Sequence, residues 1–158
     1  GVDAEELEIY QAINSFPGSG RRFEKLAENL YSDYGHHPVE IQATLQMAKE
    51  LSNDVVLVYQ PHQNVRQHEI IGQYTDSIFH DANEIYWLPT YLTRENPDLP
   101  ILTPQQLAKN IDKEKVHFAE LDDGLWQEIT AAMNSGKLVL CMGAGTIDGW
   151  IREQLAKN

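Results

Sequence analysis

Apolar positions along this chain alternate between two patterns. Continuous runs such as "VVLV" at 55–58 and "LVLC" at 138–141 are typical of strands that are covered on both faces of a sheet. Runs of this kind predict strands at 55–60, 84–89, 116–120 and 137–142. Apolar residues at helical spacing after each run predict helices near 65–80, after Thr103, at 122–134 and at 146–157.

Ahead of these four units, two short strands are predicted near 22–26 and 30–33, followed by a helix at 38–51. Pro38 would occupy the first turn of that helix, where a missing N–H costs nothing. Alternation of strands and helices predicts an α/β fold, a Rossmann-like doubly wound and mostly parallel sheet flanked by helices. Ligands of such sheets bind outside the carboxyl ends of the strands.

The first twenty residues form a separate segment. Residues 4–16 place apolar side chains at helical spacing, and Asp3 with Glu6 has the arrangement of a capping box. The sequence "PGSG" at 17–20 would end this helix and serve as a hinge. It is the best candidate for a domain boundary.

Composition excludes several classes of function. The chain has 158 residues and a formal net charge of −12, so phosphate-rich nucleic acid and anionic membrane surfaces would repel it. Its single cysteine, Cys141, lies in an apolar run and is read as a core residue. No run approaches the roughly 20 apolar residues of a membrane span, and no leader is recognised, so the cytoplasm is the expected location.

The candidate functional residues lie at the predicted strand ends, in the segments "SDYGHHP", "QPHQNVR", "PTYLTREN" and "MGAGTID". Asp33 could accept hydrogen bonds from a ribose diol, Tyr34 offers a flat face to a base, and Gly35 allows close backbone approach. The alternative is that Asp33 caps the following helix and Tyr34 packs in the core.

His62 and Arg66 are four residues apart and would share the face of a helix, where Arg66 could hold a carboxylate with two parallel hydrogen bonds. The alternative is a surface arginine paired with Glu69 or Asp76. The spacing of the six histidines matches no metal-binding motif, so no metal is expected to be held by this chain alone.

The glycines of "MGAGTID" make a weak dinucleotide signal, because the third glycine position is Asp148; a tight turn is the preferred interpretation. The only Gly-Lys pair, Gly136–Lys137, precedes a leucine, so the chain has no P-loop.

The segments "FPGSGRRFE", "SDYGHHPVEIQATL", "VVLVYQPHQNVR" and "MGAGTI" occur in this order. Together they resemble the C-terminal domain of the Mur ligases, and the alanine-adding members are the most similar. Family members have a UDP-sugar domain, a central ATPase domain with the P-loop, and a Rossmann-like C-terminal domain. The resemblance implies that residues 1–19 are the tail of the central domain with its hinge, and that 20–158 form the C-terminal domain.

The activity implied by this resemblance is ATP-dependent amide formation in peptidoglycan precursor synthesis. The lactyl carboxylate of UDP-N-acetylmuramate becomes an acyl phosphate, and the amine of L-alanine attacks it. ATP and Mg²⁺ would be held mainly by the missing central domain, and the partners would be the central and N-terminal Mur domains. The C-terminal domain would complete the ATP site and present the amino acid, so it is expected to be inactive alone.

By the same resemblance, Arg22, Asp33, Tyr34 and His36 match ATP-binding positions, whereas His62 and Arg66 match positions near the incoming amino acid. Gln63 and His68 stand where alanine-adding relatives usually have arginines. In "PTYLTREN", Tyr91 and Glu95 correspond to the Tyr and Glu of the usual "YPAGE". Three alternatives stay open: a Mur ligase adding another amino acid or a recycled peptide, a freestanding nucleotide-binding module, and a noncatalytic interaction module.

Overall fold

The structure, a computed structural model, describes residues 22–157. The predicted helix at 4–16, its cap Asp3 and the hinge at 17–20 therefore lie outside the described residues. The described part contains one six-stranded sheet. Its strands are β1 (Glu24–Ala27), β2 (Leu30–Asp33), β3 (Val55–Tyr59), β4 (Glu84–Trp87), β5 (Val116–Phe118) and β6 (Leu138–Met142).

The strand order is β1-β2-β6-β3-β4-β5, and every neighbouring pair is parallel except the antiparallel β1–β2 pair. The central strands β3 and β6 are buried along their whole length. This is the environment that their uninterrupted apolar sequences require. The predicted Rossmann-like, mostly parallel sheet is confirmed.

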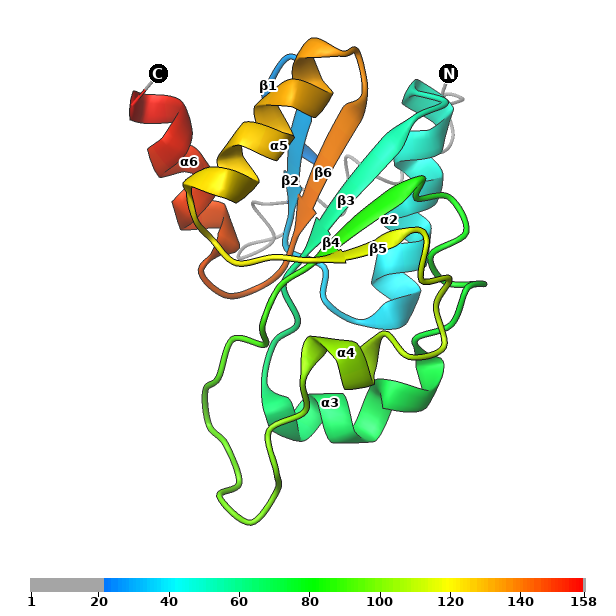
Figure 1. The fold of residues 1–158 in the computed structure, drawn as a ribbon, viewed down its shortest axis with the longest axis vertical. Helices are drawn as coiled ribbons and strands as arrows, with labels where there is room; N and C mark the ends of the chain where they lie inside the picture. The colour runs from blue at the N-terminus through cyan, green and yellow to red at the C-terminus, as the bar shows by residue number, and fades with distance from the viewer. Residues whose placement is uncertain (1–21, 158) are drawn as a thin grey trace.

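Helices cover both faces of the sheet (Figure 1). One face packs against α2 (Pro38–Leu51), α3 (Asn64–Ile70) and α4 (Pro104–Leu107), and the other against α5 (Asp123–Asn134) and α6 (Ile147–Lys157). Alternate residues of β3 contribute to the two cores: Leu57 faces the first, and Val56 and Val58 face the second. Burying each such side chain contributes roughly 1.5–3 kcal/mol.

Three helix predictions are confirmed within two residues: α2, α5 and α6. The helix expected near 65–80 is shorter. It ends at Ile70 and continues only as one 3₁₀ turn, η1 (Ile71–Gln73), because Gly72 weakens the helix and Tyr74 turns into the core at 0% exposure. The helix predicted to begin after Thr103 is also present, as the single turn α4 with Thr103 at its N-cap.

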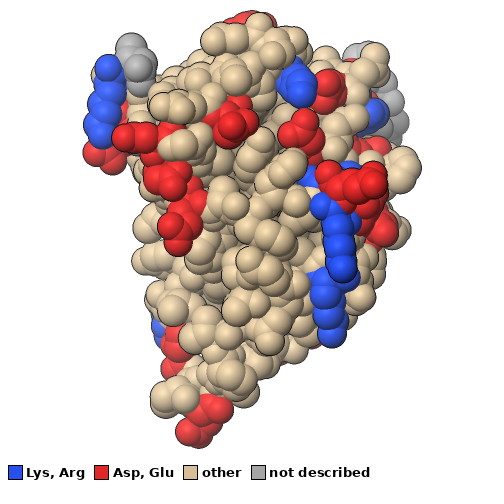
Figure 2. All heavy atoms as spheres, viewed as in Figure 1, with Lys and Arg blue, Asp and Glu red and all other residues tan. Residues whose placement is uncertain are grey.

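The carboxyl ends of the five parallel strands meet at one edge of the sheet, from which the loop between β4 and α4 extends furthest (Figure 1). Acidic side chains gather over the upper part of the face shown in Figure 2, whereas its centre has few charged side chains.

Candidate functional site

The four strand-end loops contact one another directly. The Gly143 N–H donates to the carbonyl of Asp33 at 3.1 Å, and the Gln60 N–H donates to the carbonyl of Met142 at 2.9 Å. An isolated parallel bridge pairs His62 with Tyr91. The loops after β2, β3, β4 and β6 thus form one continuous rim, as the parallel topology predicts.

Asp33 lies at the end of β2 with 1% exposure, and both of its carboxylate oxygens are hydrogen-bonded to backbone. Oδ2 accepts from the Phe23 N–H and Oδ1 from the Gly35 N–H, each at 2.7 Å. Burial raises the pKa of Asp33, and these two bonds and Arg22 oppose that shift. The residue joins the turn before β1 to the turn after β2; its contact with a ribose stays a prediction.

Residue Glu40 organises the start of α2. Its Oε1 accepts from the backbone of His37 at 3.1 Å, and its Oε2 pairs with the Arg22 guanidinium at 2.9 Å. The Nδ1 of His37 accepts from the Val39 N–H, so His37, and not Asp33, caps this helix. Although burial raises the pKa of Glu40, hydrogen bonds from Arg22 and the turn bring it below its ordinary value. Arg22 is thus held beside the predicted ATP-binding turn.

Four aromatic rings form a row along the rim. The ring of His36 lies 5.7 Å from Tyr34, edge to face, and 5.3 Å from His62. His62 in turn stacks on Tyr91 at 5.7 Å with an interplanar angle of 17°. The structure therefore brings His36, which is predicted for ATP, next to His62, which is predicted for the amino acid, and places Tyr34 on the other side of His36.

The position of His62 differs from the expectation of a shared helical face with Arg66. The helix α3 begins at Asn64, and Gln63 before it has a positive φ of 62°. This left-handed conformation breaks the helical geometry between His62 and Arg66, so their side chains do not share a helical face. Burial lowers the pKa of His62, and the nearby positive charges of His36, Arg66 and Arg94 lower it further, against the opposing effect of Glu95. Arg66 itself is exposed in the first turn of α3.

A buried hydroxyl pair connects α3 with the turn after β2. Gln67 donates through Nε2 to the carbonyl of His62, which leaves its Oε1 to accept from the Tyr74 hydroxyl at 2.6 Å. The Tyr59 hydroxyl then donates to Tyr74 at 2.7 Å or to the His36 carbonyl at 3.0 Å. The backbone at His36 and His62 is thus fixed from the core side.

Glu95 is a residue whose role the sequence did not reveal. It lies in the β4–α4 loop, and its carboxylate accepts backbone hydrogen bonds from Asn64 at 2.9 Å, Val65 at 3.0 Å and Thr93 at 2.9 Å. It caps α3 from about thirty residues away in the sequence. The signal that could have found it is its match to the glutamate of the "YPAGE" pattern.

The departures at Gln63 and His68 have a structural use. Gln63 donates to the Thr93 carbonyl at 3.2 Å, and His68 Nε2 donates to the Pro100 carbonyl at 2.8 Å. Asn64 adds a bond to Pro100 and accepts one from Leu102. These side chains tie the long loop onto α3 along its length.

Between β3 and β6, the crevice of the sheet is filled by the protein itself. The side chain of Gln60 donates to Thr146 Oγ1 at 2.9 Å and accepts from the Ile147 N–H at 3.1 Å. A Cβ at Gly145 would lie 2.6 Å from the Tyr91 ring, and one at Gly143 would lie 2.8 Å from the Gln60 carbonyl. Close packing therefore accounts for the glycines of "MGAGTID", in agreement with a tight turn.

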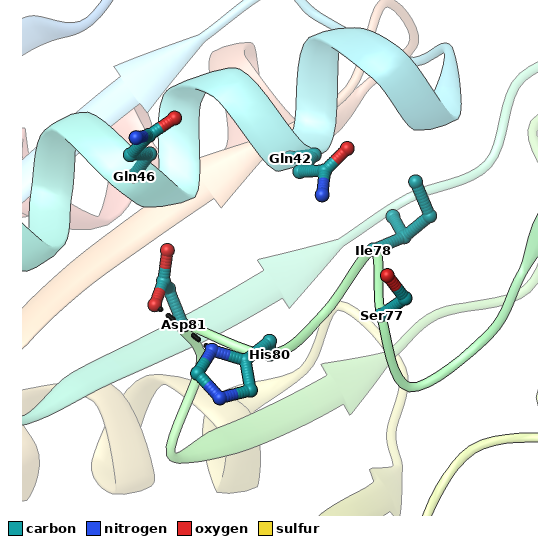
Figure 3. Close-up of a pocket in the computed structure, with 6 residues that line it drawn as sticks. All are labelled: Gln42, Gln46, Ser77, Ile78, His80 and Asp81. Carbon is teal, nitrogen blue, oxygen red and sulfur yellow. Dashed lines mark hydrogen bonds and ion pairs between the residues drawn. The ribbon is translucent and has the colours of Figure 1, made fainter.

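A hollow of about 330 Å³ lies elsewhere, between α2 and the segment before β4 (Figure 3). Gln42 and Gln46 of α2 face it from one side, and the His80–Asp81 pair, with Ser77 and Ile78, lines the other. None of these six residues belongs to the strand-end rim.

Among residues 22–157, no group of three or more His, Cys, Asp or Glu side chains could hold a metal ion. In the same part of the chain, no helix is long and apolar enough to cross a membrane.

Comparison with solved structures shows the same fold at low sequence identity. A murein peptide ligase from Psychrobacter arcticus 273-4 matches 92% of this chain and 31% of its own, with a TM-score of 0.54 and 19% identity. A domain of a Haemophilus ducreyi 35000HP protein assigned as a UDP-N-acetylmuramate:L-alanyl-gamma-D-glutamyl-medo-diaminopimelate ligase matches 86% of this chain and 98% of its own. Its TM-score is 0.50, and its identity is 19%.

The relatives found by sequence are more similar to this chain in sequence than these two structures are. The UDP-N-acetylmuramate–L-alanine ligases of Rickettsia massiliae and Rickettsia canadensis are 37% and 36% identical over 92% of this chain. The chain spans only 32% of the length of each relative. Residues 21–145 also match the family model described as "Mur ligase, glutamate ligase domain". The chain therefore belongs to the Mur ligase family and corresponds to its C-terminal domain.

Proposed function

We propose that this chain is the C-terminal domain of an ATP-dependent, amide-forming ligase of peptidoglycan precursor synthesis, which works in the cytoplasm and adds L-alanine to UDP-N-acetylmuramate. The family assignment and the names of the Rickettsia relatives support this reaction. The observation that carries the proposal is the row of rings from Tyr34 to Tyr91, which joins the two predicted ligand sites on one rim.

In this proposal, the residues of the chain bind and orient the ligands. Tyr34 and His36 present half-buried rings to the adenine. Arg22 is held near them by its ion pair with Glu40. Arg66 receives the α-carboxylate of the amino acid, while His62 lies between the two sites. ATP, held with Mg²⁺ mainly by the central domain, would supply the phosphoryl group that activates the lactyl carboxylate. Closure of this domain would exclude water from the reactive acyl phosphate.

The test uses the complete ligase that contains this chain. Phosphate release should require ATP, UDP-N-acetylmuramate and L-alanine, and the 158-residue chain alone should give none. A Tyr34→Ala, His36→Ala double variant should raise the KM for ATP about tenfold or more, whereas Arg66→Gln should raise the KM for L-alanine. Lys113→Gln, which removes a charge at the opposite edge of the sheet, should change neither.

A second candidate within the family is a ligase for another amino acid or for a recycled peptide. This candidate is favoured by Gln63 and His68, which replace two arginines of the alanine-adding pattern and instead tie the long loop to α3. A panel of amino acids and peptides in the same assay decides between the two. Faster turnover of a peptide than of L-alanine would replace the first proposal with the second.

A further inference from the structure

Arg94 occupies an unusual place in the loop between β4 and α4. It is exposed, and its φ of 52° lies in the left-handed region that favours glycine. Both of its neighbours are anchored: the Thr93 carbonyl accepts from Gln63, and the Glu95 carboxylate accepts from the first turn of α3. The backbone that carries the Arg94 side chain is therefore fixed on both sides.

These anchors place Arg94 beside the amino-acid end of the ring row. Glu95 bonds to Val65, next to Arg66, and Thr93 bonds to Gln63, next to His62. The charges of Arg66 and Arg94 both act on the imidazole of His62, as does the Glu95 carboxylate, whose oxygens already accept hydrogen bonds from backbone N–H groups. Within residues 22–157, no carboxylate forms an ion pair with either arginine, although the whole chain carries a net charge of −12.

Two guanidinium groups that act on the same imidazole also repel each other, and in the described part of the chain neither one forms an ion pair with a carboxylate. Such an arrangement is stabilised when an external anion lies between them, and the planar guanidinium suits a carboxylate with two parallel hydrogen bonds. We propose that Arg94 is a second anion-binding residue of this site, which acts with Arg66 on a carboxylate presented beside His62. The identification of that carboxylate as the α-carboxylate of the amino acid rests on the proposed function.

The test is an NMR titration of the 158-residue chain at pH 7.5, in which the His62 Cε1–H signal is followed. L-alanine is the probe, and L-alaninamide is the matched probe that lacks the carboxylate. The wild type should show a saturable shift with L-alanine and none with L-alaninamide. Arg94→Gln should weaken L-alanine binding about tenfold, and Arg94→Lys, which keeps the charge but not the planar pair of donors, should restore only part of it.

The control variant is Lys113→Gln, which makes the same change in net charge away from the rim and should bind L-alanine as the wild type does. Three results would each overturn the inference: no saturable shift in the wild type, equal shifts with both probes, or wild-type binding by Arg94→Gln. Urea unfolding of each variant verifies that the variant is folded under the conditions of the titration.

The outcome is separable from that of the proposed function. If the complete ligase releases no phosphate with L-alanine while L-alanine binding still depends on Arg94, the function fails and the anion site stands. If turnover requires L-alanine but its KM is unchanged in Arg94→Gln, the function stands and the role of Arg94 fails.

Discussion

Glu95 Oε2 accepts a 2.9 Å hydrogen bond from the backbone N–H of Asn64, a residue 31 positions earlier in the chain. The first N–H groups of a helix have no partner within the helix itself. In α3 they are satisfied by a side chain from the neighbouring strand-end loop, because no residue just before the helix caps it with its own side chain. The conformation of the loop and the start of α3 therefore depend on each other.

Replacing Glu95 with Gln should destabilise the protein. The amide keeps one acceptor but turns an N–H₂ group toward a backbone N–H, so a loss of about 1–3 kcal/mol in the free energy of unfolding is expected. Urea unfolding measures it. Glu120→Gln is the matched control, since the Glu120 side chain is exposed and should contribute little. Equal stabilities of the two variants would contradict the capping role of Glu95.

The stability of the wild type should fall in acid partly through Glu95. Burial raises the pKa of this carboxyl, but three backbone hydrogen bonds outweigh that effect and lower it below 4.5. A lowered folded-state pKa gives stability that is present above the unfolded value and lost as pH falls through the folded value. Urea unfolding at a series of pH values should therefore show a smaller acid-side loss for Glu95→Gln. A curve parallel to that of the wild type below pH 4.5 would refute the prediction.

Asp33→Asn should cost about 1–3 kcal/mol, because the amide would place a donor against the N–H of Phe23 or Gly35 in a buried site. Asp98→Asn, an exposed equivalent, should be nearly neutral. Thermal or urea unfolding measures both. If Asp33→Asn keeps its stability while the complete ligase loses affinity for ATP, Asp33 serves the nucleotide and not the fold.

Gly145→Ala should disturb the ring row. Its Cβ would lie 2.6–2.7 Å from two Tyr91 atoms, so Tyr91 must shift away from His62, with a loss of about 1–3 kcal/mol. NMR signals of His62 should move in this variant. Gly149→Ala in α6, where the added Cβ meets nothing within 4 Å, should instead stabilise the protein by about 0.5–1 kcal/mol. If both variants lose stability, the effect of Gly145→Ala cannot be assigned to its contact with Tyr91, and the prediction fails.

Arg94→Gly should raise the free energy of unfolding or leave it unchanged, since glycine adopts a φ of 52° without the steric cost that arginine bears. Arg66→Gly, within α3, should lower it by about 1 kcal/mol. Urea unfolding of the two variants compares them directly. A marked destabilisation by Arg94→Gly would show that the arginine side chain is needed for the loop to fold.

Much of the architecture follows from local sequence. The apolar runs of β3 and β6 predict buried strands, and Pro38 marks the first turn of α2, because strand and helix periodicity and the geometry of proline are properties of neighbouring residues. The convergence of the strand-end loops also follows, since parallel strands end at one edge. The resemblance to the Mur ligases was confirmed by the relatives and the family model.

Other features were decided only by contacts between distant residues. The sequence placed His62 on a helix, but Gln63 takes a left-handed conformation and His62 pairs with Tyr91 instead. It also extended α3 toward residue 80, whereas burial of Tyr74 against the core ends the helix at Ile70.

By itself, the sequence determined which segments become strands and helices, apart from the length of α3, and at which edge the polar loops gather. The tertiary structure alone decided that Glu95 caps α3, that Gln60 fills the crevice between β3 and β6, and that the four rings form a row. The physical reason is that backbone groups at element ends take their partners from whichever side chain the fold brings near. Gln60 and Ile147, for example, are 87 residues apart, a separation at which no local pattern can specify the pairing.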